Sequence, residues 1–586
     1  MRALSLISWI LVMVLVVGHI MSVGTADAQD RTILTDQAVA YQINPSHTGF
    51  VKTGPPPPLQ KRWEVDLGGP ISYPLIAEGK VFVTVSNTST YGTRLYALDA
   101  ATGQVVWGPI NISGTYYWSN AAYEAGRVFV VNFDGLLKAF DAGTGTLLWS
   151  RQLPGQYAFS SPPAAFEGIV YTGGAGSGGT VYAVDAENGA VLWTAPVENG
   201  DHSSPAISLD GVYVSYACAQ AYKFDRLTGA LLWHYSTSCS GGGGRTPVYY
   251  CGRLYVRDWA TSPSGYILDS ETGNLLGHYD AYNDPSPAVD GDLGVFLNYG
   301  TLEVRNLETG AVMWSFAGDG GLSSAPIIVN RFVYIGSTSG NLYALDPRSG
   351  QEVWSTNVGV GIPGPDEHNV SQPLTGLGAG EGLLVIPAGN LLIAFESHFD
   401  TVQEIYIGYF QRPADPGGLI YWTERLDATG GNLTEIIEAF ANSAESQALY
   451  GTINSSNIST VVNSIYNALF GRDAEIEGLN WYVNGFNSGQ YTPATIMLNV
   501  LYGAQNEDLQ SVNNKLAAAN LFTWTIDPDL DGASFLATYS GDADAQKARD
   551  FLSTVGWDAA TIPTQADVTL FIKNNIADPG DPILNP

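Results

Sequence analysis

Basic residues are scarce in this sequence of 586 residues, in which 25 Lys and Arg stand against 56 Asp and Glu, for a formal net charge of −31. Nucleic-acid binding depends on Lys and Arg that displace counterions from phosphates, so the charge balance excludes a nucleic-acid partner from our expectations. It disfavours an anionic membrane surface for the same reason. Residues 400–586 hold 23 acidic and 7 basic residues, so about half of the excess negative charge lies in the last third of the chain.

Long apolar runs are also lacking, except at the N-terminus. Arg2, the apolar run 4–17 and the small residues at 26–28 are typical of a secretory signal peptide spanning residues 1–28. The run is shorter than the roughly 20 residues of a membrane-spanning helix. We therefore expect a mature chain that begins near Gln29, has no transmembrane segment, and is exported to the periplasm, the cell surface or the medium.

Cysteine occurs only three times, at positions 218, 239 and 251. In an oxidising compartment two of the three can pair. We predict a disulfide between Cys218 and Cys239, which would join one sequence repeat to the next. The sequence does not settle the connectivity, and three buried thiols are the alternative.

Glycine and aromatic residues are abundant, with 67 Gly, 14 Trp and 32 Tyr. Helix-rich chains rarely carry so much glycine, because each interior Gly costs a helix about 1 kcal/mol relative to Ala. One phrase, such as LYALDAATGQVVW, recurs through the first 400 residues, and its glycine falls at 103, 145, 189, 229, 273, 310 and 350. The intervals of 37 to 44 residues lie in the range of four-stranded propeller blades.

The phrase is consistent with two strands joined by a tight turn. Alternating apolar residues form the first strand, Asp closes the turn, Gly supplies positive φ, and Trp follows in the second strand. The phrase varies at two places, because Gly277 replaces the Trp and Asn306 replaces the Asp. We predict that the large indoles wedge between neighbouring blades: Trp63, Trp107, Trp149, Trp193, Trp233, Trp314 and Trp354.

Eight further strand pairs are visible, one before each phrase and one before the strand at 391–396, but a Trp-ended strand follows a turn only seven times. Trp63 supplies an eighth such strand at the N-terminus, so we expect it to pair with the strand at 391–396 and to close the ring. Closure removes sheet edges that would invite aggregation. The predicted fold is multidomain, with an all-β eight-bladed propeller (35–398) followed by a mainly α-helical C-terminal domain.

The A-x-D-x-x-T-G-x-x-x-W phrase resembles the tryptophan-docking repeat of the pyrroloquinoline-quinone propeller family. That family includes quinoprotein alcohol dehydrogenases and the non-enzymatic scaffold lipoprotein of the outer-membrane β-barrel assembly machine, so the phrase is specific for fold and not for function. The resemblance implies that quinone-using members hold calcium and quinone over the channel beside a disulfide between adjacent cysteines. Here the closest cysteines are 12 residues apart and no C-x-x-C-H motif exists. The sequence therefore disfavours pyrroloquinoline quinone, and no cofactor is required.

One polar loop stands out in the last blade, within the sequence GIPGPDEHNVSQP (361–373). Loops of a propeller gather around one axis, so we predict a ligand or metal cluster at the channel mouth formed by Asp366, Glu367, His368 and Asn369. Arg245, in the loop GGGGRTP (241–247), is a second candidate ligand-binding residue. The alternatives are a solvated insertion and a flexible turn.

The C-terminal part has helical apolar spacing and an internal repeat. The segment 405–422 aligns with 465–482 at an offset of 60, and Arg412 matches Arg472. This region (400–525, two related halves) resembles a bacterial domain of unknown function, the 4214 family, which occurs in secreted and surface proteins. The resemblance implies no activity.

An acidic C-terminal extension (526–586) contains the sequence IDPDLDG. Asp527, Asp529 and Asp531 have the spacing of a calcium loop, although Thr538 stands where a bidentate Glu would complete an EF-hand. A weaker calcium site is one interpretation, and aspartates that form turns and helix caps are the other.

We predict an exported, non-catalytic binding or scaffold protein. The propeller would bind an envelope or extracellular protein or a glycan, and the helical domain would serve surface association or assembly. The alternatives are an enzyme, either a divergent quinone-dependent dehydrogenase or a hydrolase that uses the 361–373 loop, and a calcium-dependent adhesion protein.

Overall fold

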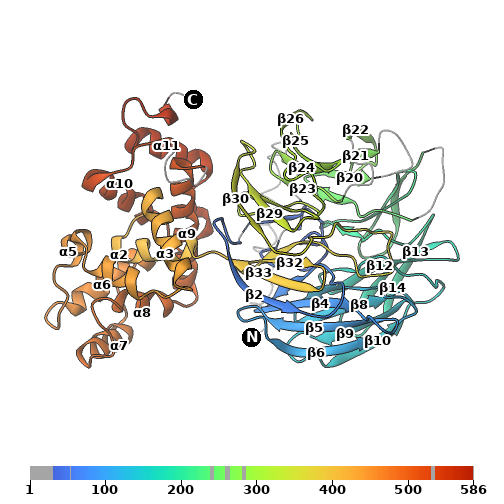
Figure 1. Ribbon diagram of the computed structural model, residues 1–586, viewed down its shortest axis with the longest axis horizontal. Helices are drawn as coiled ribbons and strands as arrows, with labels where there is room; N and C mark the ends of the chain where they lie inside the picture. Colours follow the sequence, from blue (N-terminus) through green and yellow to red (C-terminus); the bar gives the residue numbers. More distant parts are fainter. Residues whose placement is uncertain are drawn as a thin grey trace, which may run out of the picture.

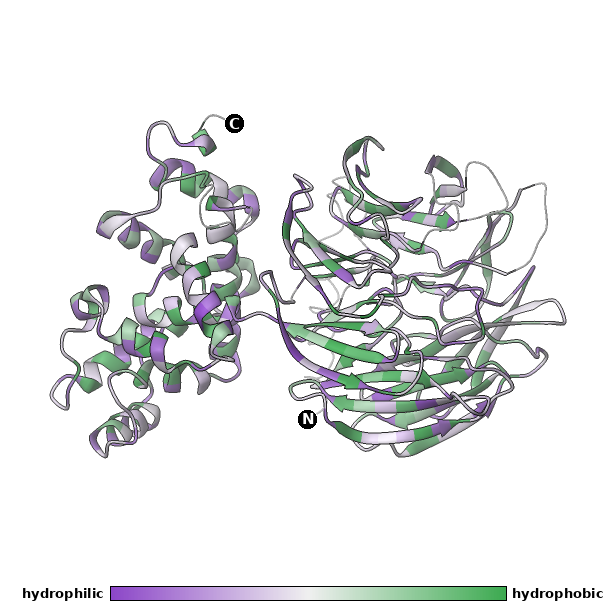
Figure 2. Cartoon of the chain, in the orientation of Figure 1, coloured by the Kyte–Doolittle hydropathy of each residue, from purple (hydrophilic) through white to green (hydrophobic). Residues whose placement is uncertain are grey.

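The computed structural model describes residues 31–33, 35–52, 54–237, 243–257, 264–279, 285–528 and 535–584. The predicted signal peptide lies outside this part of the chain. A β-propeller and a helical domain lie side by side, joined by one short connection after β33 (Figure 1). Hydrophobic residues concentrate in the propeller strands (Figure 2). The predicted fold is confirmed.

Eight sheets form the blades in the described part of the chain, each built on four antiparallel strands in chain order except where the ring closes, and one of them has a fifth strand. The strand bounds for blades 1 to 4 are β3 Leu75–Ala77, β4 Lys80–Ser86, β5 Thr93–Asp99, β6 Val105–Ile112; β7 Ser119–Glu124, β8 Arg127–Asn132, β9 Leu136–Asp141, β10 Leu147–Gln152; β11 Ala164–Phe166, β12 Ile169–Ala175, β13 Gly179–Asp185, β14 Val191–Val197; β15 Ala206–Ile207, β16 Val212–Tyr216, β17 Gln220–Phe224 and β18 Leu231–Tyr235.

The strand bounds for blades 5 to 8 are β19 Val248–Tyr250, β20 Arg253–Arg257, β21 Gly265–Asp269, β22 Leu275–Tyr279; β23 Ala288–Asp290, β24 Leu293–Asn298, β25 Thr301–Asn306, β26 Val312–Phe316; β27 Ile327–Val329, β28 Phe332–Gly336, β29 Asn341–Leu345, β30 Glu352–Asn357; β31 Gly378–Gly380, β32 Leu383–Ala388, β33 Leu391–Glu396 and β2 Gln60–Asp66. A short strand, β1 (Phe50–Val51), pairs in parallel with β27.

The last blade closes the ring as predicted. Strand β2, from the N-terminal end, pairs antiparallel with β33, and Trp63 lies opposite Ala394. The outer strand of this sheet therefore comes from the beginning of the propeller and the inner three from its end. This arrangement ties the two ends of the propeller together through backbone hydrogen bonds.

Six of the seven predicted docking tryptophans contact the turn of the next blade, and the seventh, Trp354, meets the Phe395 ring at 5.9 Å. The Trp63 indole N–H donates to the Ala100 carbonyl at 2.8 Å, and the same bond recurs from Trp107 to Ala142, Trp149 to Ala186, Trp193 to Arg226, Trp233 to Ser270 and Trp314 to Pro347. Gly103 has φ +70°, and a Cβ there would lie 2.7 Å from the Trp63 ring. Gly310, by contrast, has open space beside it. Its blade follows the one in which Gly277 replaces Trp.

The helical domain contains two related sets of four helices, followed by a C-terminal pair. Figure 1 shows them beside the propeller. Their bounds are α2 Phe399–Phe410, α3 Pro416–Ala428, α4 Thr434–Ala441, α5 Ala444–Tyr450; α6 Ile458–Phe470, α7 Ile476–Asn487, α8 Ile496–Tyr502, α9 Glu507–Ile526; and α10 Gly541–Ser553 with α11 Gln565–Asn575. Among the described residues, no helix has the length and apolar character needed to cross a bilayer.

Residues 535–584 pack against the helical domain instead of extending away from it. Phe522 of α9 contacts Phe551 of α10 at 5.3 Å and Phe571 of α11 at 6.3 Å between ring centroids. These side chains belong to the same hydrophobic core as the first two sets of helices. The segment that we predicted as an extension therefore shares the core of the helical domain.

Trp524 connects the helical domain to the propeller. Its ring stacks on Phe399 of α2 at 6.0 Å, meets Phe332 of β28 edge-on at 6.2 Å, and lies under the Arg331 guanidinium at 5.2 Å. Because Trp524 is buried, these contacts remove a large apolar surface from water. The two domains are therefore packed against each other and not only joined by the chain.

Candidate functional site

The polar loop 361–373 lies between β30 and β31 and reaches blade 5. The Glu367 carboxylate accepts hydrogen bonds from the Thr246 backbone N–H and from the Arg257 guanidinium, both at 2.8 Å. Arg245 places its guanidinium 3.8 Å from the same carboxylate. Thr246 precedes β19, the innermost strand of blade 5, so the loop closes the channel mouth at which the inner strands begin.

Burial and charge act in opposite directions on Glu367. Burial raises its pKa, but the positive charges of Arg257 and Arg245, together with the Thr246 hydrogen bond, hold the pKa of Glu367 below its usual value. The side chains of Glu367 and Arg257 are 2% and 1% exposed. A buried pair of this kind is costly to break, because removal of one partner leaves an uncompensated charge in a low-dielectric environment.

Two histidines lie beside this ion pair. The His202 and His368 rings stack at 4.6 Å between centroids, and His368 Nε2 lies 3.0 Å from the Gly244 carbonyl oxygen. Burial, followed by repulsion from His368, lowers the pKa of His202 to about 4. Asp201 lies 3.7 Å from His202, and burial raises the pKa of the Asp201 carboxyl. The mouth therefore holds one firm ion pair and a neutral His202 at ordinary pH.

The other two predicted loop residues, Asp366 and Asn369, form side-chain hydrogen bonds within the loop. The Asp366 carboxylate accepts from the His368 backbone N–H at 3.2 Å, and the Asn369 side-chain oxygen accepts from the Ser371 backbone N–H at 2.8 Å. Of the five predicted ligand-binding residues, the structure thus gathers Glu367, His368 and Arg245 at the mouth. The polar bonds of the other two lie within the loop.

Sequence reasoning missed Arg257, His202 and Asp201. Arg257 ends a strand, RLYVR, whose alternating pattern does not reveal that this position faces the axis. The Arg257 side chain is only 1% exposed, and a buried cation needs an anionic partner. The sequence could have indicated this residue only if the acidic loop 361–373 had been paired with an arginine in a strand.

The N-terminal segment fills the channel from the other side. Backbone carbonyls of residues 38–51 accept hydrogen bonds from N–H groups in inner strands around the ring, among them Ala38 to Ile76, Val39 to Tyr123, Pro45 to Ile207, Ser46 to Tyr249, Thr48 to Val289 and Gly49 to Ile328, at 2.7 to 3.0 Å. Burial and then the charge of Glu367 raise the pKa of Tyr41 in this segment. The N-terminal segment and the polar loop therefore meet near the axis.

The residues at this mouth do not fit a quinone with its calcium ion. Glu367, the carboxylate at the axis, is bound by Arg257 and Thr246, and Tyr41 and His47 are fully buried beneath it. A cation would be repelled by the two arginines, and a planar ring would have to displace this packed group. Within the described ranges, no three His, Cys, Asp or Glu residues are placed to hold a metal ion.

Two other predicted sites are only partly described. Cys218 is in a disulfide, and its predicted partner Cys239 lies outside the described residues, so this pairing stays a prediction. Asp527 is buried directly after α9, and its N–H donates to the Thr523 carbonyl at 2.9 Å. Asp529 and Asp531 also lie outside the described residues, and the calcium site likewise stays a prediction.

Comparison with known families gives two matches. A family model described as "Outer membrane protein assembly factor BamB" matches residues 133–356, and one described as "Domain of unknown function (DUF4214)" matches residues 437–509. These segments carry the repeated propeller phrase and part of the helical repeat. The two resemblances predicted from the sequence are therefore confirmed.

Individual relatives match parts of the propeller. The outer membrane protein assembly factor BamB of Moranella endobia (strain PCIT) is 29% identical over 263 residues, which are 42% of this chain and 60% of that protein. The dehydrogenase subunit of the alcohol dehydrogenase (quinone) of Komagataeibacter europaeus is 32% identical over 181 residues, 27% of this chain and 22% of that protein. This chain spans less than two thirds of the length of either relative. Among solved structures, BamB from Moraxella catarrhalis covers 58% of this chain and 97% of its own, with 18% identity and a TM-score of 0.43.

Proposed function

We propose that this chain is an exported, non-catalytic scaffold protein of the cell envelope. Its propeller would bind a protein or glycan partner without a cofactor, and its helical domain would serve surface association or assembly. The observation that supports this proposal most directly is the channel filled by the chain's own residues, with the Glu367–Arg257 pair at one mouth and the N-terminal segment below it. An axial ligand would have to break a buried ion pair, so binding is left to the outer surface.

The outer strands of the propeller offer such a surface. Leu231 and Leu232 of β18 are 56% and 50% exposed, and the same two positions before the docking residue are exposed and aliphatic in other blades: Val105 and Val106, Leu147 and Leu148, Leu275 and Leu276, and Val312 and Met313. Exposed apolar surface beyond what single scattered side chains supply marks interaction sites, and here the same exposed pair recurs on five outer strands. A protein partner agrees with this character better than a polar glycan does.

The recurring aliphatic pairs stop at the last two blades. Glu352 stands at the position of Leu231 in blade 7, and Lys61 with Arg62 takes the place of the pair in blade 8. The proposed binding surface therefore covers the outer strands of the earlier blades. An envelope location is supported by the relative that is named as an outer membrane assembly factor.

A capture experiment tests the scaffold role. The mature chain serves as bait for envelope proteins of the producing cell, next to the double variant Leu231→Ser, Leu232→Ser. Each leucine that becomes buried in a complex contributes about 1.5–3 kcal/mol, so we expect the double variant to retain the partner at least about tenfold less. Glu352→Ser, an exposed change at the matching position of blade 7, should leave capture unchanged. Equal capture by all three proteins would contradict the proposal.

A redox assay tests the rival enzyme. The chain is incubated with pyrroloquinoline quinone, calcium, a primary alcohol and an artificial electron acceptor. We expect no quinone-dependent dye reduction, because the axial position is filled. Dye reduction that saturates with quinone would establish a dehydrogenase and overturn the scaffold proposal.

A further inference from the structure

The two related halves of the helical domain place one arginine in the same position. Arg412 follows α2 and Arg472 follows α6, each directly after a residue with left-handed backbone, Gln411 at φ 60° and Gly471 at φ 72°. Such a residue ends the helix and turns the chain sharply. The two guanidinium groups therefore leave their helices in the same way.

Each guanidinium has the same kinds of partner. Arg412 forms two hydrogen bonds to Glu445 at 2.8 and 2.9 Å, and Arg472 forms two to Asp508 at 2.9 and 2.5 Å. Glu445 and Asp508 are both the second residue of a helix, α5 and α9. Each guanidinium also lies 5.4 Å from the ring of a tyrosine in the preceding helix, Arg412 from Tyr406 and Arg472 from Tyr466. The two halves thus build the same arginine site twice.

The site of the first half is covered by the C-terminal segment of the chain. The Tyr539 ring lies 5.7 Å from the Arg412 guanidinium, and its hydroxyl donates to the Pro413 carbonyl at 3.1 Å. Arg549 of α10 donates to the Phe410 carbonyl at 2.9 Å and forms an ion pair with Glu445. An aromatic ring and a cation, ten residues apart in one segment, therefore complete this site.

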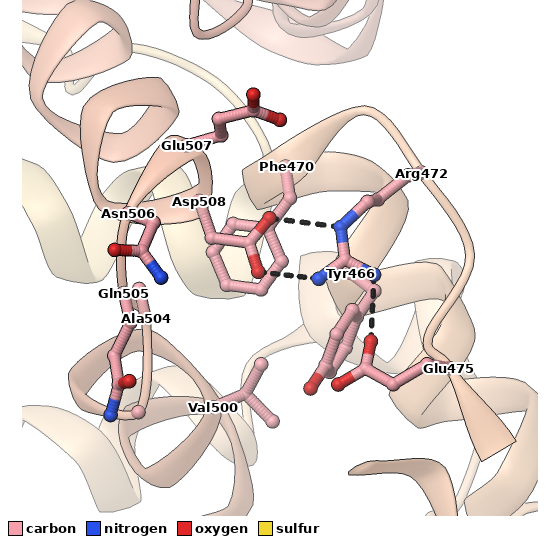
Figure 3. A pocket seen from close by; sticks show the side chains of 11 residues that line it. Tyr466, Phe470, Arg472, Glu475, Val500, Ala504, Gln505, Asn506, Glu507 and Asp508 are labelled. Atoms are coloured by element: carbon pink, nitrogen blue, oxygen red, sulfur yellow. Dashed lines mark hydrogen bonds and ion pairs between the residues drawn. The ribbon is translucent and has the colours of Figure 1, made fainter. Parts of the chain in front are cut away.

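The site of the second half is open. Figure 3 shows Arg472 held by Asp508 and Glu475 at the edge of a pocket, with Phe470 beside Asp508, Tyr466 beside the guanidinium and Glu507 at the rim. The pocket has a volume of about 490 Å³. The Arg472 side chain is 44% exposed, whereas that of Arg412 is 11% exposed. No described segment covers Arg472 as residues 539–549 cover Arg412.

The charges of the open pocket favour a cation. Among the described residues that line it, Arg472 is the only base, and the acids are Glu475, Glu507 and Asp508. In the first half, Arg549 supplies a second positive charge next to Glu445. The second half has the acidic residues without that second cation from the described part of the chain.

We propose that the open pocket beside Arg472 binds a segment of a partner protein that carries an aromatic side chain and, about ten residues further on, a basic residue. The aromatic ring would lie on the Arg472 guanidinium, as Tyr539 lies on Arg412, and the base would pair with the acids at the rim. This binding site is independent of what the propeller binds. The chemistry of the occupant follows from residues 539–549, which complete the twin site in the first half.

A peptide-binding measurement on the full chain tests this proposal. The probe is a fluorescein-labelled peptide with the sequence of residues 535–553, which contains both Tyr539 and Arg549. We expect saturable binding by fluorescence anisotropy. Arg472→Ala should weaken it about tenfold, because the loss of a cation–π contact and a charge pair amounts to about 1–2 kcal/mol. Ala504→Trp, which fills the pocket, should weaken binding similarly.

Matched controls separate this site from general electrostatic attraction. Arg425 is 43% exposed, pairs with Glu435 and lies 5.2 Å from the Tyr421 ring, but it lines no part of this pocket. Arg425→Ala should change the affinity by less than about twofold. A peptide with Tyr539→Ala and Arg549→Ala should bind about tenfold or more weakly.

Three results would overturn the proposal. The first is no saturable binding up to about 1 mM peptide, and the second is equal affinity of the Arg472→Ala and Arg425→Ala variants. The third is a concentration-dependent dimer of the chain, seen by sedimentation and abolished by Arg472→Ala, because the occupant would then be a second copy and not a separate partner.

Discussion

The two ends of the propeller channel are closed by different chemistry. At the mouth where the inner strands begin, a single carboxylate, Glu367, is held by Arg257 and by the backbone of Thr246. At the other side, backbone carbonyls of residues 38–51 accept hydrogen bonds from strands around the ring. The first closure depends on the identity of one side chain. The second combines these backbone bonds with buried side chains, because Gln42 donates to the Ser286 carbonyl and Ser46 donates to the Ile207 carbonyl.

The largest effect is expected at the side-chain closure. Glu367→Leu leaves Arg257 buried without its main partner, so we expect the free energy of unfolding to fall by about 3–5 kcal/mol, measured by urea denaturation. The double variant Glu367→Leu, Arg257→Met removes both charges and should recover most of the loss. Asp366→Leu, at the exposed neighbouring position, loses only the hydrogen bond from the His368 N–H and should cost about 1 kcal/mol or less. A loss below about 1 kcal/mol for the single variant would show that the ion pair does not hold the mouth closed.

The closure by the N-terminal segment should respond strongly where its backbone conformation is special. Gly49 has φ +64°, and a Cβ there would lie 2.9 Å from the Ala288 Cβ. Gly49→Ala should therefore cost about 2–3 kcal/mol, from left-handed strain of about 1–2 kcal/mol and the close contact. Gly79 has nearly the same φ, +67°, with nothing within 4 Å, so Gly79→Ala should cost the strain alone. Equal losses would mean that the N-terminal segment is not tightly packed against blade 6.

A smaller effect is expected when the two ends of the channel are compared by the pH dependence of the free energy of unfolding. Burial lowers the pKa of His47, in the N-terminal segment, and of His202, at the mouth, to about 4 in each case. The stability that neutral imidazoles contribute is present above the unfolded pKa of about 6.5 and is lost as the pH falls towards 4. Each histidine should therefore cost about 1–2 kcal/mol between pH 7 and pH 5.

The variants His47→Gln and His202→Gln measure these two contributions separately. In each variant the free energy of unfolding should fall less between pH 7 and pH 5 than in the unchanged chain, and by a similar amount in both. Urea denaturation at several pH values measures this. The comparison uses the slope with pH and not the absolute stability, so a general destabilisation by glutamine does not affect it. An unchanged slope for one variant would show that its histidine is already solvated in the folded chain.

The propeller could be predicted because each blade repeats the same local chemistry. A glycine with positive φ and a tryptophan four residues later recur at a spacing typical of a blade, and Trp63, as the eighth tryptophan-ended strand, indicated how the ring closes. The channel contents were harder to predict. Residues 38–51 bond to blades that lie 38 or more residues further along the chain, through backbone carbonyls and buried polar side chains, and neither kind of contact has a local sequence pattern. Arg257 lies in a strand whose alternation does not reveal the axis.

The helical domain shows a similar division. The match of Arg412 with Arg472 is visible in the sequence because the residues around both helices are alike. Their difference is not visible, because it depends on Tyr539, which lies 127 residues after Arg412 and approaches it only when the chain folds back. A contact of that kind has no local signal.

The connection between the two domains has a mechanical consequence. The chain passes from Glu396, the last residue of β33, into α2 at Phe399. A force that pulls on the helical domain therefore reaches the propeller through the ladder between β2 and β33, which is also the ladder that closes the ring. The stack of Trp524 on Phe399 and its contact with Phe332 give that force a second route into blade 7. A pulling force on the helical domain is thus divided between two contacts with the propeller. The β2–β33 pair, which keeps the ring closed, does not carry all of that force.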